Sequence, residues 1–137
     1  METRSRAAKV YLRLLAVSYA FGFALHALDV LGLRLPFSVL PLGWQVWIVY
    51  LLVLDLFAAI GLWLGRSWGI ALFVLIAFSQ LVAYLGFPGY FGQQTFLIGF
   101  HVVTLAAAAI LLARRGLTPA GARRRPPDGS PQSGVIG

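Results

Sequence analysis

The chain has 137 residues and a formal net charge of +7, with 60% hydrophobic but only 11% charged residues. Ordinary soluble domains carry about 25% charged residues, so this composition argues against a soluble enzyme and indicates one membrane domain with short tails. The chain contains no cysteine, which excludes disulfides, thiolate catalysis and cysteine-based metal or iron–sulfur sites.

The first apolar run, residues 10–31, follows a short basic segment, residues 1–9. The run is too long for the apolar region of a signal peptide and lacks a small-x-small cleavage site ahead of a polar segment. It therefore predicts a first transmembrane helix. The connector that follows, residues 32–43, contains Pro36 and Pro41, which lack backbone donors and stop helix propagation.

The second predicted span, residues 44–64, carries a single charge, Asp55, close to its middle. A helix of this length covers roughly 30 Å, the thickness of the hydrocarbon core of a bilayer. Trp44 and Trp47 at its start are placed as interfacial aromatic residues. The tight turn at residues 65–67 predicts that the second and third helices are antiparallel neighbours.

The third and fourth predicted spans, residues 68–85 and 93–113, are joined by a glycine-rich aromatic turn at residues 86–92. The tail, residues 114–137, is basic and rich in proline and glycine, a composition that predicts disorder. Four spans and two tails make an all-α, up-down-up-down transmembrane bundle over residues 10–113.

The basic residues predict the orientation. Ten of the eleven lie in the tails, in the first turns of the first helix or in the 65–67 turn, and only Arg34 lies elsewhere. The positive-inside rule therefore places both termini in the cytoplasm. The same pattern favours the lipid bilayer over nucleic acid as the partner of the positive charge. Abundant Arg, Ala, Gly and Leu suggest a GC-rich bacterial genome and hence an inner-membrane protein.

Five polar residues inside the predicted spans are the candidate functional residues: Asp55, His101, His26, Gln80 and Asp29. At a rise of about 1.5 Å per residue, all of them lie between the membrane midplane and its outer surface. Helical spacing allows a bundle in which four of them surround an outward-opening polar pocket, with Asp29 nearer the surface. A charged aspartate at a helix centre costs about 2.5–3.5 kcal/mol. We therefore expect Asp55 to be protonated, paired or near water, with His101 as its first-choice partner and His26 as the second.

These residues support more than one role. Asp55 is predicted to staple helices together through a hydrogen bond, to handle protons or ions, or to contact a ligand, and Asp29 near the surface is open to water or to a local pair with His26. For the histidines, a structural hydrogen bond is favoured over metal ligation, because no H-x-x-x-H spacing is present. We predict no metal and no cofactor. No phosphate-binding loop, dinucleotide fingerprint or catalytic triad occurs, so we predict that the protein is not an enzyme.

Residues 53–80, VLDLFAAIGLWLGRSWG through FSQ, resemble the second and third helices of DoxX-like small membrane proteins. Residues 91–101, FGQQTFLIGFH, resemble an uncharacterised family of short four-span bacterial inner-membrane proteins. The resemblance spans about residues 10–115 and implies a four-helix integral membrane protein. Some DoxX-like proteins are linked to quinone-dependent redox chemistry or to thiol-stress complexes. Asp55 matches an acidic position of that family but is shorter than its usual glutamate, which weakens any transfer of a catalytic role.

Three functions are consistent with the sequence. The first is a non-enzymatic membrane partner or assembly subunit whose polar core fixes helix register. The second is a small proton- or ion-linked transporter, which four spans alone would wall only thinly, so that it would work as an oligomer. The third is a quinone-linked accessory subunit of a membrane oxidoreductase. The sequence does not identify a small-molecule ligand or a protein partner.

Overall fold

The computed structural model describes residues 2–116, and all regular structure in this range is helical. The long helices are α1 (Glu2–Val30), α2 (Leu42–Trp63), α3 (Ser67–Leu81) and α5 (Thr95–Gly116). The shorter elements are a 3-10 turn η1 (Phe37–Val39), a π-helical turn η2 (Val82–Gly86) that continues α3, and a single helical turn α4 (Pro88–Phe91). The predicted all-α fold class is confirmed.

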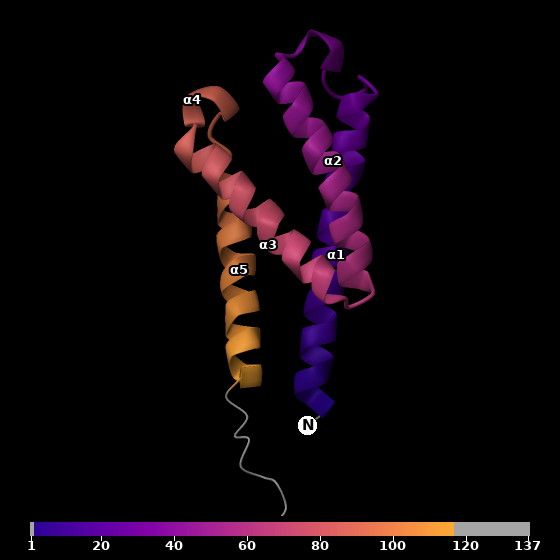
Figure 1. Ribbon diagram of the computed structural model, residues 1–137, viewed down its shortest axis with the longest axis vertical. Coiled ribbons are helices and arrows are strands. Elements are labelled where there is room, and N and C mark those ends of the chain that lie inside the picture. Colours follow the sequence, from indigo (N-terminus) through magenta and orange to yellow (C-terminus); the bar gives the residue numbers. More distant parts are fainter. Residues whose placement is uncertain (1, 117–137) are drawn as a thin grey trace, which may run out of the picture.

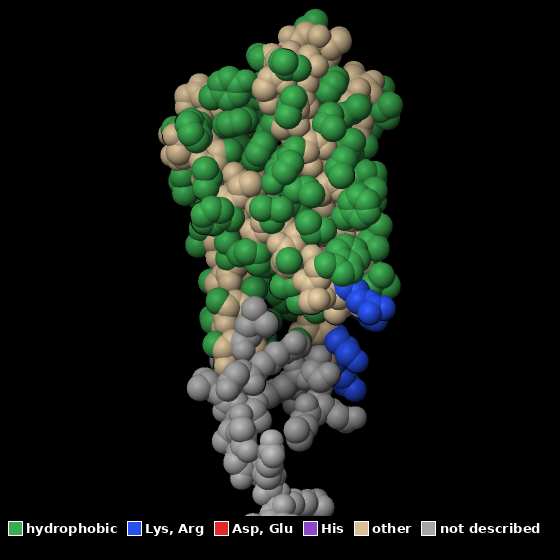
Figure 2. Space-filling view, viewed as in Figure 1, with side chains coloured by type: hydrophobic (Ala, Val, Ile, Leu, Met, Phe, Trp, Pro, Cys, Tyr) green, Lys and Arg blue, Asp and Glu red, His purple; other side chains and the backbone are tan. Residues whose placement is uncertain are grey.

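Three helical segments are long and apolar enough to cross a membrane: Arg6–Val30, Leu42–Trp63 and Ser67–Gly86. The apolar stretch of α5 in the described part of the chain, Thr95–Leu111, is shorter. Many large apolar side chains of these helices are exposed, including Leu14, Phe21, Phe78, Phe96 and Val103. Figure 2 shows this apolar surface, with Lys and Arg side chains visible only toward the end at which α1 begins. Such a surface suits hydrocarbon, because α-helices satisfy their own backbone polar groups there.

The helix boundaries differ from the predicted ones mainly at the two ends. α1 begins at Glu2 and so includes most of the basic segment 1–9, whose Ala, Arg, Lys and Glu residues are good helix formers. α5 extends to Gly116, and the rest of the predicted tail, residues 117–137, lies outside the described residues. Within the predicted turn 86–92, Pro88 starts the short helix α4, because the fixed φ of proline suits a first helical position.

Two helices end in the same glycine-dependent motif. After α2, the N–H of Gly65 donates to the carbonyl of Leu62 and the N–H of Arg66 donates to that of Gly61, at 3.0 and 2.9 Å. Gly65 has a φ of +64°, and Gly32, which ends α1 with the equivalent pair of bonds, has a φ of +69°. A left-handed residue at this position satisfies the last carbonyls of a helix and reverses the chain, so α3 starts directly beside the end of α2.

Figure 1 shows the arrangement of the helices. α1 packs along α2, and α2 contacts α3, which crosses obliquely away from the foot of α2 and packs against α5. The start of α1, the α2–α3 turn and the end of α5 point to one end of the molecule, called here the basic end. The α1–α2 connector and α4 lie at the opposite end, called here the connector end.

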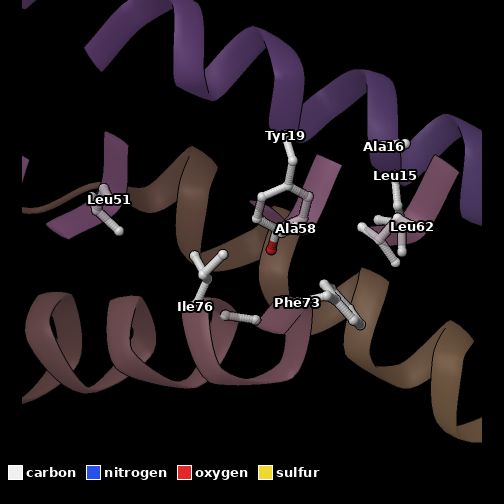
Figure 3. Packing of buried hydrophobic residues seen from close by; sticks show 9 residues of the cluster. Leu15, Ala16, Tyr19, Leu51, Ala58, Leu62, Phe73 and Ile76 are labelled. Atoms are coloured by element: carbon white, nitrogen blue, oxygen red, sulfur yellow. The ribbon is translucent and has the colours of Figure 1, made fainter. Parts of the chain in front are cut away.

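The hydrophobic core joins α1, α2 and α3 (Figure 3). Tyr19 of α1 packs edge-to-face on Phe73 of α3, with ring centroids 6.0 Å apart. The remaining core residues are Leu15, Ala16, Leu51, Ala58, Leu62, Ile76 and Ala77. Beyond the core toward the basic end, the backbones of α2 and α3 meet at Gly61 and Gly69, where a Cβ on either residue would overlap the facing backbone. Most of this core lies toward the basic end of the molecule.

Candidate functional site

A cavity of about 400 Å³ lies between α1, α2, α3 and α5. It extends from Asp55, in the middle of α2, to Arg34 of the α1–α2 connector and Gln94 just before α5. All five candidate residues line it, together with several aromatic side chains. Its volume lies within the range of ligand pockets, about 300–1,000 Å³. The role of the five candidate residues in this cavity stays a prediction.

His26 of α1 lies between two buried carboxylates. Its Nε2 lies 3.7 Å from Oδ2 of Asp55, and its Nδ1 lies 3.7 Å from Oδ2 of Asp29. Both distances exceed that of a hydrogen bond, about 2.9 Å, by about 0.8 Å. Only a protonated imidazole donates from both nitrogens. His26 is therefore placed to exchange a proton with either acid after a small movement.

Asp29, at the end of α1, is 1% exposed and is paired with Arg34. Nε of Arg34 donates to Oδ1 at 2.6 Å and Nη2 donates to Oδ2 at 2.5 Å, a bidentate pair. This hydrogen bonding raises the pKa of Arg34 above its ordinary value. The sequence left Asp29 open to water or to a local pair with His26. The structure brings His26 to 3.7 Å from the buried carboxylate, and the turn at Gly32 also returns the chain so that Arg34 covers it.

His101 of α5 pairs with Gln80 of α3, not with Asp55. Its Nε2 lies 2.8 Å from Oε1 of Gln80, and both side chains are buried. The expectation that His101 would be the first partner of Asp55 is therefore wrong, and His26 is the histidine beside that acid. Because a carbonyl oxygen only accepts, Nε2 of His101 is the donor, and Nδ1 of the neutral ring is left as an acceptor.

Five polar atoms of the cavity-lining residues are buried without a hydrogen-bond partner. They are the hydroxyl of Tyr19, Nδ1 of His26, Nε1 of Trp47, Oδ1 of Asp55 and Nδ1 of His101. Each unsatisfied buried group costs about 1–3 kcal/mol, and buried polar groups otherwise have partners from protein or water. Their concentration around one cavity indicates that this region works with water or a bound molecule, or after a rearrangement.

Sequence reasoning missed the aromatic part of the cavity wall. Trp44 and Trp47 were predicted as interfacial residues, yet both line the cavity. Phe91 of α4 lies against them, with ring centroids at 5.4 and 5.2 Å, and Nε1 of Trp44 donates to the carbonyl of Tyr90. No signal in the sequence indicated that these two tryptophans belong to the same cavity as Asp55. Their contact with Phe91 forms only because α4 folds over the start of α2. For Arg34, the signal was its position as the only basic residue away from the tails, the first turns of the first helix and the 65–67 turn.

Within the described residues, no group of three or more His, Cys, Asp or Glu side chains is arranged to hold a metal ion. The site is an acid–imidazole arrangement inside a partly aromatic cavity.

A model of one protein family matches residues 6–117, which is most of the chain and nearly all of the described part. The chain belongs to DUF6163, a family of unknown function.

The DUF6163 match covers α1 from Arg6 onward, every later element up to α5, and all residues of the cavity. Searches of curated proteins and of solved structures found no match. The family therefore gives the chain a membership without an activity.

Proposed function

We propose that this protein is a small proton-linked membrane transporter, and that Asp55 and His26 are its proton-exchanging pair. The observation that carries the proposal is the position of His26, with each ring nitrogen 3.7 Å from a buried carboxylate. Histidine is the side chain best suited to pass protons near neutral pH, and ionisable groups inside a membrane generally serve ion or proton pathways.

The cavity has the shape that a carrier needs in one of its states. From the connector end, Arg34 contacts Asp29, His26 lies beside Asp29, and Asp55 lies beside His26, so that ionisable groups follow one another along the cavity. Toward the basic end, the apolar core of α1, α2 and α3 follows Asp55 and offers no further ionisable group. A polar site toward one end of the molecule, followed by an apolar core, fits one state of an alternating-access carrier.

The membrane arrangement that goes with this proposal is the predicted one. α5 serves as the fourth span, both termini lie in the cytoplasm of a bacterium, and the cavity opens outward through the inner membrane. Arg6, Lys9 and Arg13, near the start of α1, and Arg66, in the α2–α3 turn, support this orientation. Because only four helices surround the cavity, we expect a homo-oligomer in which neighbouring copies complete the wall.

Carboxyl infrared spectroscopy tests the proton exchange directly. The chain has only four acidic side chains, and Asp29 and Asp55 are the two in the apolar region, so the spectrum is simple. In purified protein titrated from about pH 5 to 8, Asp55→Asn identifies the Asp55 band. His26→Gln should then shift the titration midpoint of that band, whereas His101→Gln, the matched control, should leave it in place because His101 bonds to Gln80.

The proposal fails if the Asp55 band stays constant over the whole titration, or if His26→Gln and His101→Gln have equal effects. Helix content and thermal unfolding of each variant, measured by circular dichroism, separate a lost proton coupling from a lost fold. Where His26→Gln does not fold, the wild-type titration alone decides, because an Asp55 band that does not titrate contradicts proton exchange.

The second candidate is the first hypothesis of the sequence analysis, a partner or assembly subunit in which Asp55 fixes helix register. It is supported by the contact of Asp55 with α1, where a Cβ on Gly22 would lie 2.6 Å from Oδ2 of Asp55. A register-fixing hydrogen bond predicts that Asp55→Asn is tolerated while Asp55→Leu destabilises. The carrier predicts that Asp55→Asn folds and loses the pH response.

The quinone-linked role implied by the DoxX resemblance is a third candidate, supported by the aromatic wall at Trp44, Trp47 and Phe100. Flat rings stack on such side chains. It predicts that a quinone or a redox partner purifies with the protein from its native membrane, and lipid extraction followed by mass spectrometry checks this.

A further inference from the structure

The fixed charges of the cavity wall leave one carboxylate without a cationic partner. Arg34 is the only Lys or Arg among the lining residues, and both of its hydrogen bonds go to Asp29. That pair is neutral as a unit. With both histidines, His26 and His101, in their neutral form, a deprotonated Asp55 gives the cavity a charge of −1.

The polar side chains that share the cavity wall with Asp55 on the surrounding helices do not neutralise it. They are Tyr19 and His26 from α1, Gln80 from α3, Tyr84 from η2 and His101 from α5. None of these side chains is a permanent cation. Oδ1 of Asp55 has no hydrogen-bond partner, so the negative charge is open to an added positive group.

The walls around this charge are largely aromatic and aliphatic. Trp44, Trp47, Tyr84 and Phe100 line the cavity together with Leu25, Leu35, Ile48, Leu51 and Leu97. Aromatic faces attract organic cations through the negative face of the ring, most strongly where water is excluded. An inorganic cation would instead need a shell of oxygen ligands. An anion would need a basic partner, and Arg34 is already paired with Asp29.

From these observations we infer that the cavity binds a monovalent organic cation with an aromatic or branched apolar group, its charged end against Asp55. This inference rests on the proposed function and names its substrate class. As the cation enters, the O–H bond of the Asp55 acid breaks and its proton passes to Nε2 of His26. The imidazolium then passes its Nδ1 proton by way of Asp29, the carboxylate that Nδ1 faces, to solvent at the connector end. One positive charge enters and one leaves, so the charge of the cavity is conserved.

Tryptophan fluorescence gives a direct binding test in reconstituted full-length protein. Two of the four tryptophans, Trp44 and Trp47, line the cavity. The probe is benzyltrimethylammonium, and phenylmethanesulfonate is its anionic counterpart of similar size and shape. We expect saturable quenching by the cation only, and a loss of affinity of at least about tenfold in Asp55→Asn. Glu2→Gln removes an acid at the far end of α1 and should leave the affinity unchanged.

Wild-type protein alone provides a second measurement, in case Asp55→Asn does not fold. In weakly buffered vesicles, binding of benzyltrimethylammonium should release about one proton per cation, detected with a pH-sensitive dye. Binding with no proton release at any pH, equal affinity in Asp55→Asn, or saturable binding of the sulfonate would each overturn the inference.

The two proposals fail in different ways. If the infrared titration shows the His26-dependent Asp55 band while benzyltrimethylammonium does not bind at millimolar concentration, the organic-cation inference is wrong and proton exchange stands. If the Asp55 band does not titrate, the proton-linked function is wrong, and with it the exchange step of this inference.

Discussion

The contact between Gly61 and Gly69 should make the start of α3 intolerant of a single methyl group. A Cβ on Gly69 would lie 2.5 Å from the backbone nitrogen of Leu62 and 2.6 Å from Cα of Gly61. The carbonyl carbon of Gly61 would lie closer still, and ordinary contacts of a Cβ begin near 3.4 Å, so α3 would have to move by roughly 1 Å. The obstacles are backbone atoms, which have no rotamer in which to give way.

The free-energy cost of Gly69→Ala follows from this geometry. Overpacking costs about 1–3 kcal/mol, and a rigid obstacle puts this site near 3 kcal/mol. Alanine recovers about 1 kcal/mol because it is a better helix former than glycine. We therefore expect a net loss of about 2 kcal/mol in the free energy of unfolding.

A matched control is available in α5, where a Cβ on Gly99 would meet nothing within 4 Å. Gly99→Ala should gain up to about 1 kcal/mol from helix propensity alone. Both variants are measured by unfolding in mixed micelles with a denaturing detergent, followed by circular dichroism. If Gly69→Ala is as stable as Gly99→Ala, the close backbone contact does not exist and the packing of α2 on α3 has to be revised.

Two other substitutions test the site. Arg34→Gln can replace only one of the two hydrogen bonds that Asp29 accepts from Arg34, and it should lower the free energy of unfolding by about 1–3 kcal/mol. Adding Asp29→Asn to this variant should largely restore the stability, and a loss that is not restored would refute the pairing. Because Asp29 raises the pKa of Arg34, the contribution of Arg34 is complete below its ordinary pKa and is lost only above the raised one. The difference in unfolding free energy from wild type should thus stay constant from about pH 7 to 10. Gly22→Ala pushes on Oδ2 of Asp55, 2.6 Å from the new Cβ, and should shift the Asp55 infrared band and cost about 1 kcal/mol; Gly22→Ala combined with Asp55→Ala should lack this cost, and an equal cost there would refute the contact.

Much of the helical layout was accessible from the sequence because its signals are local. Long apolar runs predicted three spans that the structure confirms as long enough to cross a membrane. Pro36, Pro41 and the glycine at position 65 marked the breaks, because they act through their own φ angle or missing N–H. The helical start of α1 escaped prediction, since a basic segment with good helix formers carries no apolar periodicity.

The pairing inside the cavity depended on information that helical spacing does not hold. Depth along each helix placed Asp55 and His101 at the same level, but it says nothing about how helices slide, rotate and cross. Because α3 crosses obliquely and packs on α5, Gln80 reaches His101 first. Asp55 lies instead against α1, whose long contact with α2 brings His26 to it.

The same backbone contact at Gly61 and Gly69 limits how the molecule can change shape. α2 and α3 are closest at this point and diverge from it toward the connector end (Figure 1). A larger angle between α2 and α3 widens the cavity at the connector end but opens no gap at the contact of Gly61 with Gly69. Access to Asp55 from the basic end would therefore require α1 or α5 to slide or tilt along a fixed α2–α3 frame. If the protein is the carrier proposed above, cross-links between α2 and α3 near the turn should leave transport intact, while cross-links that tie α1 or α5 to that frame should stop it.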